Sequence, residues 1–212
     1  VGLLDPTEGS VEVVGGRAAS SPEQLRRIGF LAQDAPVYAS LSIADHLRLG
    51  RHMNPGWDDA FAQGRIAELD LDVKQRAGGL SGGQRAQLAL TLALAKRPEL
   101  LLLDEPVASL DPLARRDFLA TLTSYIAENG ISVVMSSHLL ADLERVCDFL
   151  VLVSSARVQL ADEVDHLLAT HRRIVGPRRE LSTLPSDQHV VWSSQTERQT
   201  TAVIRVDGLI LD

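Results

Sequence analysis

The feature that most constrains the fold is the run of four leucines at 100–103, which is followed by Asp104, Glu105 and Pro106. An apolar run this short, without alternating polar residues, is typical of a strand buried on both faces of a parallel sheet. Ligands of such sheets gather at the carboxyl ends of the strands. Asp104 is therefore placed to hold Mg²⁺ through oxygen, and Glu105 to orient or deprotonate an attacking water. The pair is equally compatible with a solvent-exposed cap on the next segment.

A second feature is a glycine-rich turn that opens a helix expected over 81–96, with the sequence Ser81, Gly82, Gly83 and Gln84. A serine and backbone N–H groups at a helix N-terminus can bind an anion, and glycines permit its close approach. An ordinary helix cap preceded by a glycine turn gives the same pattern. Taken alone, that simpler interpretation is favoured.

Alternating strand and helix patterns predict a layered α/β sheet over most of the chain. Strands are expected over 10–14, 28–32, 100–103, 131–135 and 149–153, and helices over 21–27, 42–53, 58–69, 81–96, 111–128 and 139–147. Beyond about Arg172, two alternating segments predict a β-hairpin with Trp192 in its core. We therefore expect an α/β domain at 1–170, with a helical subdomain at about 41–97, and a small, incomplete β-hairpin region at 171–212.

Three single residues add weaker signals. His138 follows the strand expected over 131–135, where it could contact a terminal phosphate, although a lone histidine is more often a surface or capping residue. Gln33 ends the strand expected over 28–32, and a lone glutamine there has little meaning. Asp111, followed by Pro112, is compatible with an ordinary helix start.

The order and spacing of these features resemble the ABC-type ATPases. The matching elements are Gln33 (Q-loop), Leu80–Gln84 (signature motif), Leu100–Glu105 (Walker B), Ser109–Pro112 (D-loop) and His138 (H-loop). Five elements in the family's order make the resemblance specific, and it covers about residues 1–169. It implies a P-loop NTPase-like ABC ATPase sheet with a helical subdomain, and ATP and Mg²⁺ as cofactors.

The resemblance also implies a role for each residue around the nucleotide. Asp104 would hold Mg²⁺, Glu105 would be the general base, and His138 would contact the γ-phosphate. Gln33 would sense both Mg²⁺ and the attacking water, and it would couple the site to a membrane partner. These four residues would form one subunit's own half of a hydrolytic site.

The other half would come from a second ATPase subunit, identical or different. The residues offered to that subunit's ATP would be Ser81, Gly82, Gly83 and Gln84. Asp111 would communicate across the dimer. The segment 34–53 would meet an integral membrane permease, so the protein would power transmembrane transport as a peripheral subunit on the cytoplasmic side of the cell membrane. Within the family, Ser136–Leu140 and Glu144–Asp148 are similar to bacterial drug- or antibiotic-efflux ATPases.

The chain departs from the family in one respect: it has no phosphate-binding P-loop. The motif requires Gly-x-x-x-x-Gly-Lys-[Ser/Thr], and neither lysine of the chain, Lys74 or Lys96, stands in such a context. We expect that the upstream part of the natural protein is absent and that this chain alone is inactive. Since the absent strand would lie near Leu100–Leu103, we also expect an unpaired apolar edge there and a tendency to aggregate.

Two other functions fit the motifs less well. A soluble ABC ATPase acting on DNA or the ribosome is disfavoured by the net charge of −7, and no long coiled coil fits between Gln33 and Ser81. We therefore expect no nucleic-acid partner. A non-catalytic regulatory subunit is disfavoured because Ser81, Glu105 and His138 are all present.

The single cysteine excludes an internal disulfide, and no apolar run is long enough to cross a bilayer.

Overall fold

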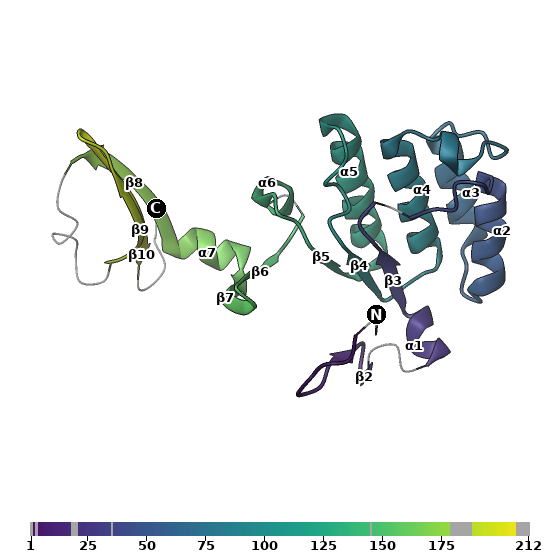
Figure 1. Ribbon diagram of the computed structural model, residues 1–212, viewed down its shortest axis with the longest axis horizontal. Helices are drawn as coiled ribbons and strands as arrows, with labels where there is room; N and C mark the ends of the chain where they lie inside the picture. Colours follow the sequence, from purple (N-terminus) through teal and green to yellow (C-terminus); the bar gives the residue numbers. More distant parts are fainter. Residues whose placement is uncertain are drawn as a thin grey trace. The chain divides into compact units, whose positions relative to one another are not determined.

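The computed structural model describes residues 2, 4–17, 21–34, 36–144, 146–178 and 188–206 of the 212-residue chain. They form two compact units, Val1–Leu140 and Ala141–Asp212, which are described separately below. Figure 1 labels the helices and strands of both units. In the first unit, four long helices stand side by side, and each contacts the next along the chain: α2 (Ile43–Met53), α3 (Asp59–Glu68), α4 (Gly82–Ala95) and α5 (Pro112–Asn129).

The first unit is built on a three-stranded parallel sheet. Its strands are β3 (Ile28–Leu31), β4 (Leu100–Leu103) and β5 (Ser132–Met135), in the order β3-β4-β5. The expected buried parallel strand is confirmed. The expected unpaired edge on this strand is wrong, because β4 lies in the centre and pairs with a neighbour on each side.

One face of this sheet is apolar and partly exposed. Phe30, Leu102 and Val134 lie level across the three strands, and Phe30 and Val134 are 42% and 59% exposed. The alternate residues Leu101 and Leu103 are buried. An exposed apolar row of this kind favours association between molecules. If the chain aggregates as expected, the cause would be this exposed apolar face, because β4 has no unpaired edge.

The helices of the first unit begin at the residues that the sequence predicts. They are α1 (Pro22–Arg26), α2 (Ile43–Met53), α3 (Asp59–Glu68), α4 (Gly82–Ala95) and α5 (Pro112–Asn129), and their N-caps are Ser21, Ser42, Asp58, Ser81 and Asp111. In each helix the cap's side-chain oxygen accepts a backbone N–H of the first turn, which is otherwise without a partner. Gly130 ends α5 with a left-handed φ of 62°, a conformation that glycine adopts without steric cost.

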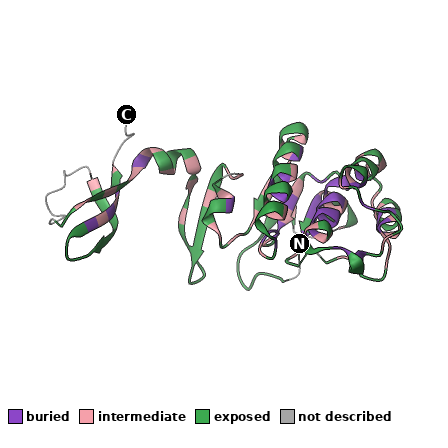
Figure 2. Cartoon of the chain, turned by 90° about the horizontal axis from the view of Figure 1, so that it is seen from above, coloured by how far each residue is buried: buried purple, intermediate pink, exposed green. Residues whose placement is uncertain are grey.

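Three of these helices share one apolar core with the short 3-10 helix η1 (Ala77–Gly79). Its buried members are Ile43 and Leu47 of α2, Ala62 and Ile66 of α3, Leu88 and Ala95 of α4, and Leu71, Ala77 and Leu80 between α3 and α4. Figure 2 shows the buried residues concentrated in this part of the chain. The helical layer therefore holds the start of α4 in a fixed position.

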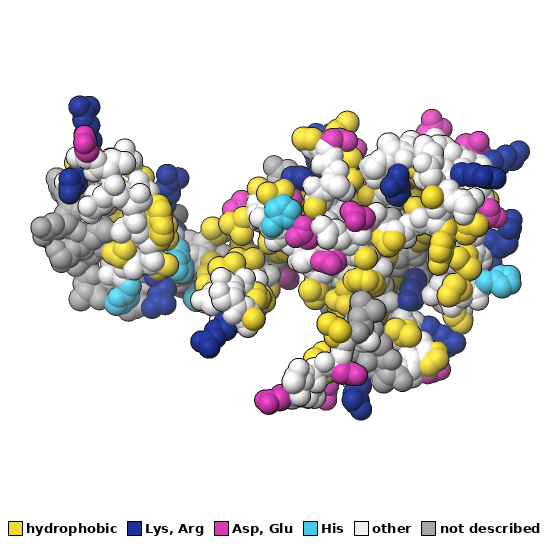
Figure 3. Space-filling model, viewed as in Figure 1, with side chains coloured by type: hydrophobic (Ala, Val, Ile, Leu, Met, Phe, Trp, Pro, Cys, Tyr) yellow, Lys and Arg dark blue, Asp and Glu magenta, His cyan; other side chains and the backbone are white. Residues whose placement is uncertain are grey.

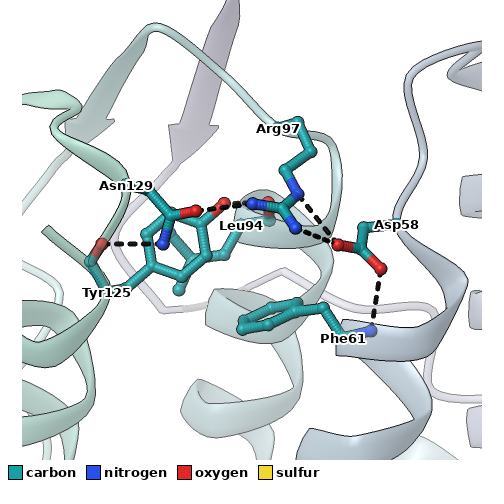
Figure 4. A network of polar contacts seen from close by, with 6 residues as sticks. All are labelled: Asp58, Phe61, Leu94, Arg97, Tyr125 and Asn129. Carbon is teal, nitrogen blue, oxygen red and sulfur yellow. Dashed lines mark hydrogen bonds and ion pairs between the residues drawn. The ribbon is translucent and has the colours of Figure 1, made fainter.

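An arginine joins the ends of three helices (Figure 4). Arg97, which follows α4 with a φ of 56°, donates from Nε to Asp58 Oδ2 at 2.9 Å and from Nη1 to Asn129 Oδ1 at 2.5 Å. Asp58 in turn accepts the N–H of Phe61 at 2.8 Å. The Tyr125 hydroxyl of α5 donates to a carbonyl in the last turn of α4 at 3.0 Å. The Phe61 N–H, and then Arg97, hold the pKa of Asp58 below its ordinary value.

The first unit also carries a small hairpin near its N-terminus. Strands β1 (Glu12–Val13) and β2 (Gly16–Arg17) pair antiparallel, so the strand expected over 10–14 is shorter than predicted. Arg27 donates to the carbonyl of Val14 at 2.8 Å and bonds to Glu99 through two nitrogens, which ties the hairpin to the start of β4.

The second unit is largely antiparallel β-structure. Strands β6 (Phe149–Ser154) and β7 (Arg157–Glu163) form a hairpin, which is followed by α7 (Val164–Thr170). A separate three-stranded sheet contains β8 (His171–Pro177), β9 (Gln188–Gln195) and β10 (Gln199–Val206), with β10 in the centre. The hairpin of β9 and β10 is confirmed, whereas β7, α7 and β8 were not expected. The predicted division after residue 170 falls at the junction of α7 and β8 and stays a prediction.

Two expectations for this part of the chain are wrong. Trp192 is not a core residue, because 53% of it is exposed on β9. The helix expected over 139–147 is limited to α6 (Leu140–Leu143). The N–H groups of Val146 and Cys147 both donate to the carbonyl of Leu143, at 3.1 and 2.9 Å, and this turn ends the helix. Within the described ranges, no helix combines the length and the apolar character needed to cross a membrane.

The arginine network yields a prediction about stability. Asp58→Ala should lower the free energy of unfolding of the first unit by about 1–2 kcal/mol, because the change removes both the cap of α3 and an ion pair whose carboxylate side chain is 18% exposed. Urea unfolding followed by the fluorescence of Trp57, in a Trp192→Phe background, measures the first unit alone.

The pH dependence gives an internal check. Since the pKa of Asp58 is lowered on folding, its stabilisation is present above the ordinary value of 3.8 and is lost as the pH falls below it. The difference between the wild type and Asp58→Ala should therefore shrink in acid. The exposed Asp117→Ala serves as control and should change stability by less than about 0.5 kcal/mol. Equal stability of wild type and Asp58→Ala at pH 7 contradicts this account.

Candidate functional site

The candidate site lies where the three parallel strands end. Leu31, Leu103 and Met135 are level in the sheet. Two further backbone bonds extend this pairing by one residue: Asp104 N–H donates to Leu31 O, and Ser136 N–H donates to Leu103 O, each at 2.9 Å. Asp104 and Ser136 are thus fixed by backbone bonds to the neighbouring strand. Figure 3 shows acidic side chains and a histidine on the same face of the first unit.

The structure brings the predicted general base and the predicted phosphate-contacting histidine together. His138 Nδ1 lies 2.9 Å from Glu105 Oε2, with side chains 60% and 29% exposed. Glu105 has a left-handed backbone with φ of 43°, which is uncommon for a residue other than glycine. Its N–H donates to Ser136 Oγ at 2.9 Å. The pair is solvent-accessible, so a small molecule can reach it.

The same serine hydroxyl contacts Asp104, the predicted magnesium ligand. Ser136 Oγ donates to Asp104 Oδ1 at 2.8 Å. The sequence motifs do not mark this hydroxyl as a site residue. The available signal was its position directly after the strand expected over 131–135, which the parallel register places beside Asp104.

The residues present fit Mg²⁺ in one of its usual binding modes. Among the described residues, no three histidine, cysteine or carboxylate side chains cluster as a metal cage. Mg²⁺ commonly takes one or two protein carboxylates and completes its shell with water and substrate phosphate. Asp104 offers such a carboxylate. Gln33 is exposed two residues past β3 at the same edge, and it makes no hydrogen bond to Asp104 or Glu105, both of which are described.

The glycine-rich turn forms a reciprocal helix cap. Ser81 Oγ accepts the N–H of Gln84 at 3.2 Å, and Gln84 Oε1 accepts the N–H of Ser81 at 3.0 Å. The two glycines differ in their surroundings. A Cβ built on Gly82 meets nothing within 4 Å, whereas one on Gly83 lies 2.8 Å from the Cβ of Ala114 on α5. Gly82 leaves room for an external ligand, and Gly83 lets α4 and α5 approach each other.

Asp111 caps α5 in the way the simpler interpretation predicts. Its Oδ1 accepts the N–H groups of Leu113 and Ala114, each at 3.0 Å. A helix start of this kind is stabilised by a carboxylate at the N-cap. The contacts within the chain therefore account for Asp111 structurally, and its role across a dimer stays a prediction.

An apolar groove of about 710 Å³ lies between α1, β3, the end of α2, and α4. Its lining includes Phe30, Ala32, Val37 and Met53. Lys96 closes one wall and donates from Nζ to two backbone carbonyls at 2.7 Å each. Burial lowers the pKa of Lys96. The groove adjoins the segment 34–53, for which the sequence predicts a membrane partner.

The parallel sheet and the helical layer form an α/β fold of the ABC ATPase class. The chain belongs to the ABC transporter family: the family model described as "ABC transporter" matches residues 1–108.

Relatives include importers and an antibiotic transporter. The thiamine import ATP-binding protein ThiQ of Jannaschia sp. (strain CCS1) is 30% identical over 181 residues, which cover 83% of this chain and 79% of that protein. The bacitracin transport ATP-binding protein BcrA of Bacillus licheniformis is 29% identical over 179 residues, covering 82% of this chain but 58% of that protein.

Solved structures show the same fold. CbiO1 of Clostridium perfringens, described as part of the ABC transporter complex cbiONQ, has a TM-score of 0.66 and 22% identity, over 79% of this chain and 70% of that one. A dimeric post-hydrolysis ATP-binding cassette bound to ADP and phosphate has a TM-score of 0.65 and 21% identity, over 76% of each chain. The chain therefore has the mixed α/β ABC ATPase fold, with a C-terminal antiparallel β region.

The two glycines of the turn give a matched pair of variants. Gly83→Ala should lower the free energy of unfolding by about 1–3 kcal/mol, because its Cβ would press on Ala114. Gly82→Ala should be neutral or slightly stabilising, since its Cβ has open space and alanine favours helix. Urea unfolding monitored by Trp57 in the Trp192→Phe background tests both. Equal midpoints for the two variants would show that α5 does not constrain Gly83.

Proposed function

We propose that the chain is the ATP-hydrolysing part of a subunit that powers transport through a separate membrane-spanning partner. The observation that carries the proposal is the 2.9 Å contact between Glu105 and His138, beside Asp104 at the end of β4. Membership of the ABC transporter family supports ATP as the nucleotide.

In this proposal Glu105 accepts the proton of the water that attacks the γ-phosphorus of ATP. His138 contacts the carboxylate through Nδ1, and its imidazolium form, which donates from both ring nitrogens, would also donate from Nε2 to a phosphate oxygen. Asp104 would hold Mg²⁺, which neutralises phosphate charge when bound. Gln33, at the end of the neighbouring strand, would orient the attacking water. ADP leaves as the bond between the β–γ bridging oxygen and the γ-phosphorus breaks.

A second ATPase subunit would complete each site. Ser81 and Gly82 are exposed at the N-terminus of α4, where the helix offers N–H groups to an anion. The open space at Gly82 supports contact with a phosphate held by another subunit. The relative that is dimeric with ADP and phosphate is consistent with this arrangement.

The groove beside β3 is the proposed docking site of the permease. It is mostly apolar, and it adjoins the predicted Q-loop at Gln33 and the segment 34–53. A partner bound in this groove would contact Ala32, the residue before Gln33. CbiO1, which has the same fold, is described as part of an ABC transporter complex, and this supports a membrane partner. With such a partner, the subunit would lie at the cytoplasmic face of the membrane.

The proposed direction of transport is efflux. The support is the similarity of Ser136–Leu140 and Glu144–Asp148 to efflux ATPases, together with the match to a bacitracin transporter. The thiamine importers match at a comparable identity and favour the opposite direction. We also propose that the 212-residue chain alone hydrolyses no ATP, because its sequence contains no P-loop.

The role of Glu105 leads to a test in the full-length protein. Glu105→Gln should lower kcat for ATP hydrolysis at least about 100-fold, because the amide cannot accept the proton, while ATP affinity is retained. Phosphate release and equilibrium nucleotide binding measure the two effects. Glu128→Gln, an exposed glutamate on α5, is the matched control and should leave kcat unchanged. Hydrolysis by Glu105→Gln at the control rate would remove Glu105 from its proposed role.

The groove leads to a second test. Met53→Glu, at a lining residue that is 69% exposed, should weaken co-purification of the full-length protein with its membrane-spanning partner by about tenfold, because a carboxylate would be buried in an apolar contact. Val73→Glu, at an apolar residue outside the groove lining that is 43% exposed, is the control. Equal recovery with both variants would exclude the groove as the docking site.

A further inference from the structure

The hydroxyl of Ser136 lies between the two consecutive carboxylate residues of the candidate site. It donates to Asp104 Oδ1 at 2.8 Å and accepts the N–H of Glu105 at 2.9 Å. A serine hydroxyl has one hydrogen to donate, so these two contacts fix its direction. The backbone N–H of Ser136 is also bound, to Leu103 O at 2.9 Å. The hydroxyl is therefore held in place by its own strand while it contacts the end of β4.

The contact with Glu105 acts at a point of backbone strain. With φ of 43°, Glu105 has left the extended strand conformation, so its N–H no longer follows the sheet pairing. The Ser136 hydroxyl provides that N–H with an acceptor, and the carbonyl of Glu105 accepts the N–H of Ala108 at 3.2 Å. In this conformation the Glu105 carboxylate reaches His138. Strained residues of this kind persist where surrounding contacts specify them.

The contact with Asp104 uses one of the two carboxylate oxygens. The hydrogen bond to Oδ1 limits rotation of the Asp104 side chain and leaves Oδ2 free of this contact. Because the Ser136 hydroxyl is neutral, it orients the carboxylate without cancelling the negative charge that a cation requires. Asp104 is thus presented in one orientation.

We propose that Ser136 is a positioning residue of the hydrolytic site, whose single hydroxyl sets the orientation of Asp104 and the left-handed backbone of Glu105. The proposal rests on the proposed function for the roles of those two carboxylates. Ser136 takes this place because the parallel register sets it beside Asp104, one residue past the level pair Leu103 and Met135. The adjacent Ser137 does not share the position, since its hydroxyl accepts the N–H of Leu139 at 3.0 Å.

The first experiment measures amide hydrogen exchange by NMR in the 212-residue chain without nucleotide. Ser136→Ala should speed exchange of the Glu105 amide by about tenfold, the loss expected for one hydrogen bond. The Asp104 amide, bound to Leu31 O, should exchange as before. Ser136→Thr should restore the slow rate, and Ser137→Ala should not alter it. Unchanged exchange at Glu105 in Ser136→Ala overturns the proposal.

Should Ser136→Ala fail to fold, Ser136→Thr and Ser136→Val provide the same comparison. They have nearly the same shape and differ in the hydroxyl, so slow exchange at Glu105 in the threonine variant alone supports the proposal. Equal exchange in both overturns it.

The second experiment measures ATP hydrolysis in the full-length protein. Ser136→Ala should lower kcat by about tenfold or more and raise the Mg²⁺ concentration for half-maximal rate, with a smaller change in KM for ATP. Ser136→Thr should recover most of the rate, and Ser137→Ala should match the wild type. Normal kcat and Mg²⁺ dependence in Ser136→Ala overturn the positioning role. A wild-type protein that hydrolyses no ATP refutes the proposed function instead, and the exchange measurement still tests the contact.

Discussion

The parallel pairing of β4 with a strand on each side is the constraint on which the rest of the first unit depends. It places Leu31, Leu103 and Met135 at one level, so the residues that follow the three strands leave the sheet at one edge. Asp104 and Ser136 come from segments far apart in sequence, and the shared register makes them neighbours. The contact between Glu105 and His138 has the same origin. The strand register thus brings the residues of the candidate site together, and hydrogen bonds between their side chains then orient them.

The helical layer positions the glycine-rich turn that is proposed to contact the ATP held by a second subunit. A common apolar core holds α2, α3 and α4 together, and Arg97 links the ends of α3, α4 and α5. The apolar core includes Leu80 and Leu88, and it thereby fixes the N-terminal part of α4, where the glycine-rich turn is exposed. Because Gly83 is needed for the approach of α5 and Gly82 is not, packing and ligand access are divided between two adjacent residues. A motif that looks uniform in sequence therefore has two physical roles.

The predictions succeeded where the signal was local. Helix starts at Ser42, Ser81 and Asp111 depend on side-chain caps within the same turn, and all three were identified. The predictions failed where the outcome depended on distant segments. An unpaired edge was expected on β4, but pairing order is decided by segments distant in sequence. Trp192 was expected in a core because it alternates with polar residues, but alternation does not show whether another layer covers that face.

By itself, the sequence determined the α/β class and the ABC family, and it singled out Asp104, Glu105 and His138 as candidate site residues, because short-range periodicity, capping and motif order are properties of the chain. Tertiary structure alone decided that β4 is central, that His138 meets Glu105, and that the Ser136 hydroxyl contacts both Asp104 and Glu105. The physical reason is that a hydrogen bond between side chains more than thirty residues apart exists only once the strands have paired in register, and no local pattern specifies that register.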